Sequence, residues 1–151
     1  MHSYEGLISA AYVVAAILFI LALGGLSGQE KAKRAIWYGI IGMVLAVVAT
    51  VAAAGGQWVL MGIMIALGGV GGWSIANRVQ MTQMPQLVAL FNGVGGGAAA
   101  LVAIVEYLKL GEEATTAVVV ATVFTVIVGC VSFSGSVITF LKLQELMTTR
   151  P

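Results

Sequence analysis

Few side chains capable of chemistry lie within the long apolar stretches of this sequence. One stretch contains Asn92, and a later one contains Ser132, Ser134 and Ser136. An amide donates and accepts hydrogen bonds but does not take up a proton near neutral pH. Ser132 and Ser136 are four residues apart, so on a helix they share a face, whereas Ser134 points elsewhere. Asn92 and the two serines therefore fit either a structural hydrogen bond between helices or a polar pathway.

Ionisable groups avoid the middle of every apolar stretch. No charged residue falls between Arg34 and Arg78, and the lone histidine, His2, stands at the N-terminus. The lone cysteine, Cys130, lies in an apolar run, where an inert buried thiol is the common interpretation. Proton pumps usually mark their path with acidic residues or histidine. The sequence predicts no catalytic residue and no metal site, and any proton path here would consist of neutral polar groups.

The glycines next to Asn92 resemble a dinucleotide-binding fingerprint. Gly93, Gly95 and Ala98 fit the pattern G-x-G-x-x-G/A. That motif needs a strand, a tight turn and a helix start within one βαβ unit. These glycines lie inside an apolar helical pattern, so we expect no cofactor site in this chain. Small residues four apart instead favour close helix packing in lipid, as in the pairs Gly68 with Gly72 and Gly93 with Gly97.

Composition assigns the chain to the membrane. Of its 151 residues 60% are hydrophobic and 9% are charged, whereas soluble domains carry about 25% charged residues. A soluble chain this short could not bury so much apolar surface. The net charge of +1 argues against a nucleic-acid partner, which needs a clustered basic face.

The apolar stretches predict an all-α bundle of five transmembrane helices in a single domain over residues 1–151. A helix needs roughly 20 apolar residues to cross a bilayer, and lipid tolerates only helices or closed barrels. Pro85 fits the first turn of the fourth helix, where its missing N–H costs nothing. The expected helices lie near residues 6–26, 35–54, 58–76, 85–108 and 115–141.

The basic residues predict the orientation of the bundle. With the N-terminus outside and the C-terminus inside, only Lys109 falls outside. Such an excess of lysine and arginine on the inner side follows the positive-inside rule. The inner basic residues are Lys31, Lys33, Arg34, Arg78, Lys142 and Arg150.

The inner segment Asn77–Gln86 is rich in glutamine and methionine. It contains Arg78, Gln83 and Gln86, with two methionines three residues apart. A polar linker at the membrane surface is the ordinary interpretation. The functional interpretation is a docking surface for a soluble domain, because flexible methionine side chains adapt to a mobile partner. The basic segment 28–34 is a second surface of this kind.

Three blocks of sequence resemble the membrane domain of the proton-translocating NAD(P) transhydrogenase beta subunit. They are the opening AAYVVAAILFILALGGLS, the block RVQMTQMPQLVALFNGVGGGAAALV, and FSGSVITFLKL near the C-terminus. The MTQMPQLVA block followed by a Gly/Ala-rich helix is the most specific part. The resemblance covers nearly the whole chain, and the three blocks occur in the family's order.

The resemblance implies a function and a set of partners. Hydride passes from NADH to NADP⁺ between soluble domains while a proton crosses the inner (plasma) membrane. NAD(H) and NADP(H) would bind in the soluble domains and not in this chain. The chain would correspond to the first five helices of the subunit, as a fragment or a split subunit. Its partners would be alpha-subunit membrane helices, the remaining beta-subunit helices and the nucleotide-binding domains, in a dimer of the complex.

One residue departs from the family pattern. Many members have a proton-relaying histidine where this chain has Asn92. Asparagine cannot replace histidine as a proton carrier. The resemblance therefore implies a titrating group on another subunit, with Asn92, Ser136 and Ser132 as polar contacts on the pathway. Arg78, Gln83 and Gln86 would couple the membrane part to the soluble domain.

Two other functions fit the residues. A small secondary transporter would bind its substrate near the midplane at Asn92, although such transporters usually carry an intramembrane charge. A structural membrane subunit would use Asn92 and the serines only for helix packing.

Overall fold

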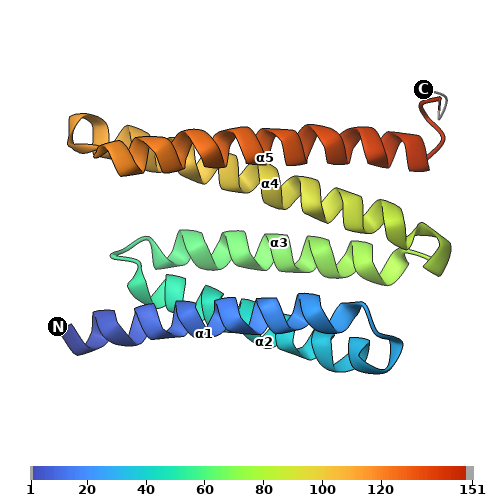
Figure 1. The fold of residues 1–151 in the computed structure, drawn as a ribbon, viewed down its shortest axis with the longest axis horizontal. Helices are drawn as coiled ribbons and strands as arrows, with labels where there is room; N and C mark the ends of the chain where they lie inside the picture. The colour runs from blue at the N-terminus through green and yellow to red at the C-terminus, as the bar shows by residue number, and fades with distance from the viewer. Residues whose placement is uncertain (1, 149–151) are drawn as a thin grey trace. The chain divides into compact units, whose positions relative to one another are not determined.

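The computed structural model describes residues 2–148, and across them the chain forms helices and no strand (Figure 1). The side chain of His2 and the whole of Arg150 lie outside the described part. Two 3₁₀ turns, η1 (Met81–Gln83) and η2 (Gly111–Glu113), precede and follow the fourth long helix. The five long helices are α1 (His2–Leu26), α2 (Gln29–Ala53), α3 (Trp58–Arg78), α4 (Met84–Leu110) and α5 (Thr116–Leu143).

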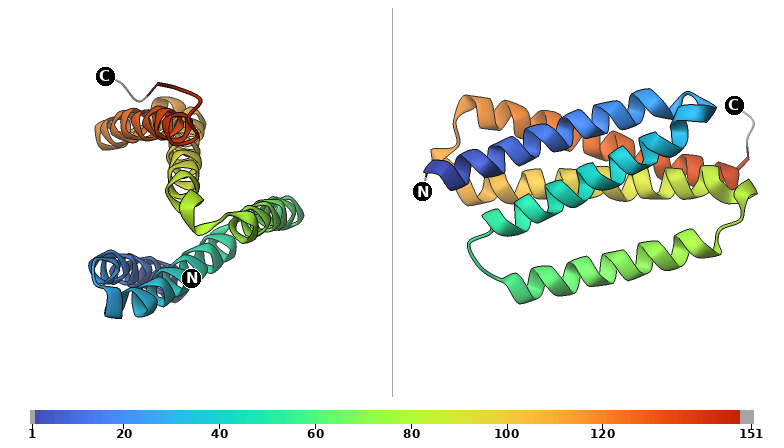
Figure 2. Two further views of the ribbon diagram at one scale, coloured as in Figure 1. Left: turned by 90° about the vertical axis from the view of Figure 1, so that its right-hand side faces the viewer. Right: turned by 90° about the horizontal axis from the view of Figure 1, so that it is seen from below.

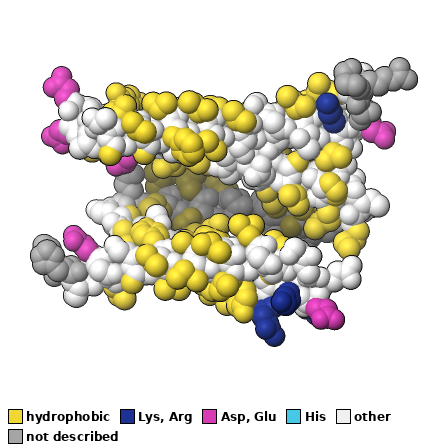
Figure 3. Space-filling model, viewed as in Figure 1, with side chains coloured by type: hydrophobic (Ala, Val, Ile, Leu, Met, Phe, Trp, Pro, Cys, Tyr) yellow, Lys and Arg dark blue, Asp and Glu magenta, His cyan; other side chains and the backbone are white. Residues whose placement is uncertain are grey.

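All five long helices have the length and composition of membrane spans. Each contains an 18-residue window whose mean hydropathy lies between 1.8 and 2.6. Large apolar side chains cover the outer faces of the helices, and the charged side chains gather at helix ends (Figure 3). These observations confirm an all-α, multi-pass membrane protein. Which side of the membrane each terminus faces stays a prediction.

The helices are longer than the apolar runs that predicted them. The largest difference is α2, which begins at Gln29 and not near Ala35. The basic segment expected as a loop therefore forms the first turns of this helix. Its lysines, arginine and glutamate are good helix formers, and Glu30 in the first turn complements the helix dipole. Hydropathy measures only the part of a helix that lies in lipid, so it misses such polar turns.

Several helix ends have identifiable local causes. Pro85 occupies the first turn of α4, as the sequence predicted. Gly111 ends this helix with φ of +52°, a conformation that glycine adopts without strain. Thr115 caps α5 by accepting a hydrogen bond from the Val118 N–H at 3.4 Å. The segment predicted as a linker, Asn77–Gln86, is mostly taken up by the neighbouring helices, since only residues 79–83 separate α3 from α4.

The chain divides into two compact units, residues 1–70 and 71–151, and each contains one antiparallel helix pair. In the first unit α1 packs along α2 (Figure 2). Among the side chains described, the buried residues of this pair are all small and recur every seven positions: Ala15 and Ala22 on α1, and Ala35, Gly42 and Ala49 on α2. A seven-residue period keeps one seam facing the partner helix.

The second unit repeats this construction with α4 and α5. Its buried small residues are Gly93 and Ala100 on α4, and Gly129 and Ser136 on α5, again seven apart. Lipid offers no hydrophobic force to drive helices together, so close backbone approach through small residues stabilises the pair. This seam differs from the first in one respect: it includes a hydroxyl, that of Ser136.

Candidate functional site

Small residues bring α4 and α5 close together around Asn92. A Cβ added at Gly129 would lie 2.5 Å from the Gly96 carbonyl oxygen and 2.9 Å from Ala100 Cβ. One added at Gly93 would lie 2.9 Å from Ser136 Cβ. Distances below 3.0 Å are not tolerated by real side chains. The crossing therefore requires glycine on both helices, and it places the serines of α5 beside α4.

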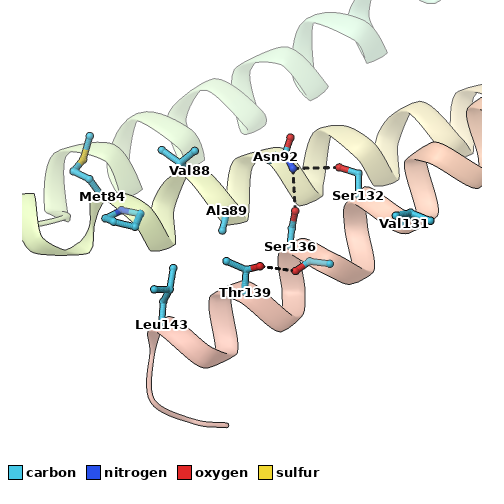
Figure 4. A pocket seen from close by; sticks show the side chains of 11 residues that line it. Met84, Val88, Ala89, Asn92, Val131, Ser132, Ser136, Thr139 and Leu143 are labelled. Atoms are coloured by element: carbon cyan, nitrogen blue, oxygen red, sulfur yellow. Dashed lines mark hydrogen bonds between the residues drawn. The ribbon is translucent and has the colours of Figure 1, made fainter. Parts of the chain in front are cut away.

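The amide of Asn92 bridges the two helices. Its Nδ2 atom donates to Ser136 Oγ at 3.0 Å and to Ser132 Oγ at 3.2 Å (Figure 4). One amide nitrogen carries two protons, so each serine oxygen receives one. The structure thus joins all three residues that the sequence predicted for the pathway. Ser132 and Ser136 share a face of α5, as their spacing indicated.

The other hydroxyls on α5 are engaged differently. Ser134 donates to the Cys130 carbonyl at 2.9 Å, and Thr139 donates to the Gly135 carbonyl at 2.8 Å. Such bonds to the helix's own backbone are usual for membrane serine and threonine. Ser132 and Ser136 accept from Asn92, and neither hydroxyl donates a hydrogen bond among the described residues. Their hydroxyl protons therefore stay available to a further acceptor.

Asn92 also presents an acceptor to its surroundings. Its Oδ1 atom points away from both serines (Figure 4), and among the described residues it accepts no hydrogen bond. The side chain is exposed in the described chain. An unpaired polar group facing hydrocarbon is costly. This oxygen is therefore expected to contact another protein group or water.

Two hollows on the α4–α5 pair meet at this amide. One, of about 770 Å³, extends toward Met84 and Leu143, and the other, of about 450 Å³, extends toward Ala99 and Phe124. Asn92 and Ser132 line both hollows. The remaining lining is apolar apart from Ser136, Thr139 and Thr125. The two hollows form an apolar groove along the helix pair. The serine hydroxyl donors and the Asn92 acceptor oxygen lie at one position along this groove.

The residues predicted to couple to a soluble domain lie near the start of α4. Arg78 is the last residue of α3, Gln83 lies in η1, and Gln86 belongs to α4. Gln86 does not face away from the helix pair: its Nε2 donates to the Leu143 carbonyl oxygen at 3.1 Å. Their coupling role stays a prediction.

The predicted packing glycines fall into two groups. Gly93 and Gly97 lie against α5, where Gly97 approaches the ring of Phe133. A Cβ added at Gly68 or Gly72 would meet no atom within 4 Å among the described residues. The packing role of these two α3 glycines stays a prediction.

The family model described as "NAD(P) transhydrogenase beta subunit" matches residues 8–151. The chain belongs to the NAD(P) transhydrogenase beta subunit family. Two sequences of Rhodospirillum rubrum, each named NAD(P) transhydrogenase subunit beta, are 41% identical to it over 157 residues. The alignment covers 97% of this chain and 33% of each relative, so the chain spans about a third of their length.

Within this transhydrogenase family chain, the nucleotide fingerprint is part of a helix. Gly93, Gly95 and Ala98 lie inside α4, and in the described chain neither a strand nor a turn comes directly before them. Their backbone N–H groups belong to a continuous helix, so they cannot cradle a pyrophosphate. The described residues therefore do not fit a dinucleotide at this motif.

Two features of the site escaped the sequence analysis. Gly96 contacts Ser132 and Gly129, although only Gly93 and Gly97 were assigned to packing on α4. The seven-residue spacing of small residues on four helices would have indicated the seam. The bond from Gln86 to Leu143 had no comparable signal, because it depends on the register of two helices.

Proposed function

We propose that this chain forms part of the proton-conducting membrane domain of a transhydrogenase, which couples hydride transfer from NADH to NADP⁺ to proton movement across the inner membrane. The N-terminus would face outside and the C-terminus inside. NAD(H) and NADP(H) would bind to soluble domains of the complex. The observation that carries the proposal is the amide of Asn92 donating to Ser132 and Ser136 beside an open groove.

The groove is suited to contact with other membrane helices. The curated relatives are about three times as long as this chain, so further segments of the subunit, and alpha-subunit helices, are natural occupants. A titrating side chain on one of them would accept from a serine hydroxyl or donate to Asn92 Oδ1. Asn92 would then orient the titrating group without carrying the proton itself.

Coupling requires two conformations that the nucleotide state distinguishes. In one conformation the polar site would communicate with the outside, and in the other with the inside. The segment from Arg78 to Gln86, with Gln83 in η1, would contact the soluble domain and bias this equilibrium. The basic turns at the start of α2 provide a second inner surface.

Proton uptake in reconstituted complex tests the proposal. In Asn92→Leu we expect hydride transfer to continue while proton uptake per hydride falls by about tenfold, the equivalent of losing two hydrogen bonds. Ser134→Ala is the matched control on α5, because Ser134 bonds only to its own helix. Uptake in Asn92→Leu equal to that of the control would contradict the pathway role. Loss of assembly would indicate a structural role, and solute flux without nucleotide would indicate a transporter.

A further inference from the structure

The C-terminal end of α5 has its last four carbonyl groups satisfied, and one of the four partners comes from α4. The Gln144 N–H bonds to the Phe140 carbonyl at 2.9 Å, and the Leu146 N–H bonds to the Leu141 carbonyl at 2.9 Å. The Glu145 N–H bonds to the Lys142 carbonyl at 3.1 Å. These three bonds are local. Helix ends usually leave such carbonyls to water or to caps.

The fourth carbonyl, that of Leu143, accepts from the side chain of Gln86 at 3.1 Å. These two residues are 57 positions apart. The bond therefore fixes the first turns of α4 to the last turn of α5. It is the only side-chain bond between the two helices, among the described residues, apart from those of Asn92.

The Gln86 bond lies one heptad, or about two helical turns, from the polar site along both helices. Gln86 precedes Gly93 by seven residues, and Leu143 follows Ser136 by seven. Gly93 is the residue whose added Cβ would touch Ser136. The Gln86 bond and the Asn92–Ser136 contact therefore lie along the same α4–α5 seam. Gln86 is the third residue of α4, which begins directly after η1.

Only the donor side of the Gln86 amide is engaged within the described chain. Its Oε1 atom is buried and accepts no hydrogen bond within residues 2–148. Leaving a buried acceptor unpaired costs free energy. Packing alone would be served better by an apolar side chain at this position. The donor function toward Leu143 is the feature that distinguishes glutamine from such a side chain.

We propose that Gln86 is a positioning residue: its bond to Leu143 sets the register of α4 against α5 and thereby holds Asn92 in contact with Ser136. The proposal rests on the proposed proton function of that site. A structural role alone would lower assembly and both activities together. A positioning role changes the number of protons taken up per hydride in complexes that assemble and transfer hydride.

Three variants of Gln86 in the complete reconstituted complex separate these roles. Gln86→Leu removes the donor, Gln86→Glu replaces it with an acceptor, and Gln86→Lys keeps a donor that also suits a helix C-terminus. We expect proton uptake per hydride to fall about fivefold in the leucine and glutamate variants, the effect of one net hydrogen bond. The lysine variant keeps most of the uptake. Gln144→Leu is the control, since that exposed side chain makes no hydrogen bond within the described chain.

Amide hydrogen exchange provides a second measurement. In the leucine and glutamate variants, exchange at residues 144–147 should rise, while the lysine variant stays close to wild type. Uptake in Gln86→Leu equal to that in Gln144→Leu overturns the proposal, and so does an equal loss in all three variants. If the leucine variant does not assemble, the comparison of the glutamate and lysine variants tests the proposal. Both introduce a charge, so they differ mainly in whether the side chain donates a hydrogen bond. Failure of all three to assemble would assign Gln86 to assembly and overturn the positioning role.

The proposed function can fail independently. Normal pumping in Asn92→Leu would refute the proton site whatever Gln86 does. Loss of pumping in Asn92→Leu with normal pumping in every Gln86 variant would refute only the positioning role.

Discussion

The two helix pairs of this chain share one packing scheme but differ in what their seams contain. Along α1 and α2 every buried residue whose side chain is described is alanine or glycine. Along α4 and α5 the corresponding series includes Ser136, which accepts a hydrogen bond from Asn92. Because the two seams share the same spacing of small residues, that spacing accounts for packing. The hydroxyl of Ser136, which the first seam lacks, is available for chemistry.

Hydrogen bonds between the helices show the same contrast. In the first pair the Tyr4 hydroxyl donates to the Ala52 carbonyl at 2.8 Å, and Tyr12 bonds Thr50 at 2.9 Å. Thr50 in turn donates to the Ala46 carbonyl at 2.8 Å, so the chain of donors ends on backbone. At Asn92 the bonds within residues 2–148 leave the amide oxygen and the two serine hydroxyl protons without a partner. The hydroxyl donors that link the first pair are therefore all used, whereas the polar groups of the second pair can still bind a further partner.

The largest expected effect concerns packing at the closest crossing. Gly129→Leu would force a side chain against the Gly96 carbonyl, whereas Gly42→Leu meets its nearest neighbour, Leu18 Cβ, at 3.2 Å. Overpacking costs about 1–3 kcal/mol or more. We expect Gly129→Leu to prevent assembly and Gly42→Leu to lower thermal stability in detergent less severely. Gly62→Leu is the control, since an added Cβ there meets no atom within 4 Å among the described residues and Gly62 lines neither hollow; equal damage in all three would contradict these contacts.

The next effect separates the serines of α5. Ser136→Ala removes the shorter bond to Asn92 at a buried position, and Ser132→Ala removes the longer bond. One such bond is worth roughly 1 kcal/mol, or about fivefold. We expect proton uptake per hydride to fall about fivefold in Ser136→Ala and less in Ser132→Ala. A loss in Ser134→Ala as large as that in Ser136→Ala would show that the hydroxyl content of α5 matters and its bond to Asn92 does not.

The smallest effect belongs to the first helix pair. Tyr12→Phe removes the bond to Thr50 and leaves the ring in place. We expect a loss of stability of about 1 kcal/mol or less, and no change in proton uptake per hydride. Thermal unfolding and liposome assays on one preparation provide both values. A pumping defect here would show that the chemistry is not confined to the second pair.

Much of the fold could be predicted from the sequence, for physical reasons that also explain the errors. Apolar runs long enough for a bilayer identified five helices, and Pro85 marked the start of the fourth. The start of α2 at Gln29 was missed, because hydropathy does not register a polar helical turn outside lipid. The four-residue spacing placed Ser132 and Ser136 on one face. Their contact with Asn92, like that of Gln86 with Leu143, depends on the register between α4 and α5. The spacing of residues within one helix does not determine that register.

The central claim is that Asn92 and Ser136 act as one unit in moving protons, and a double-mutant cycle tests it most directly. Proton uptake per hydride is measured in reconstituted complex for Asn92→Leu, Ser136→Ala and the combination. If the two groups act through their bond, the double variant is no worse than Asn92→Leu alone, with a coupling energy of about 1 kcal/mol. Losses that simply multiply would show that the residues act independently, and would contradict this account.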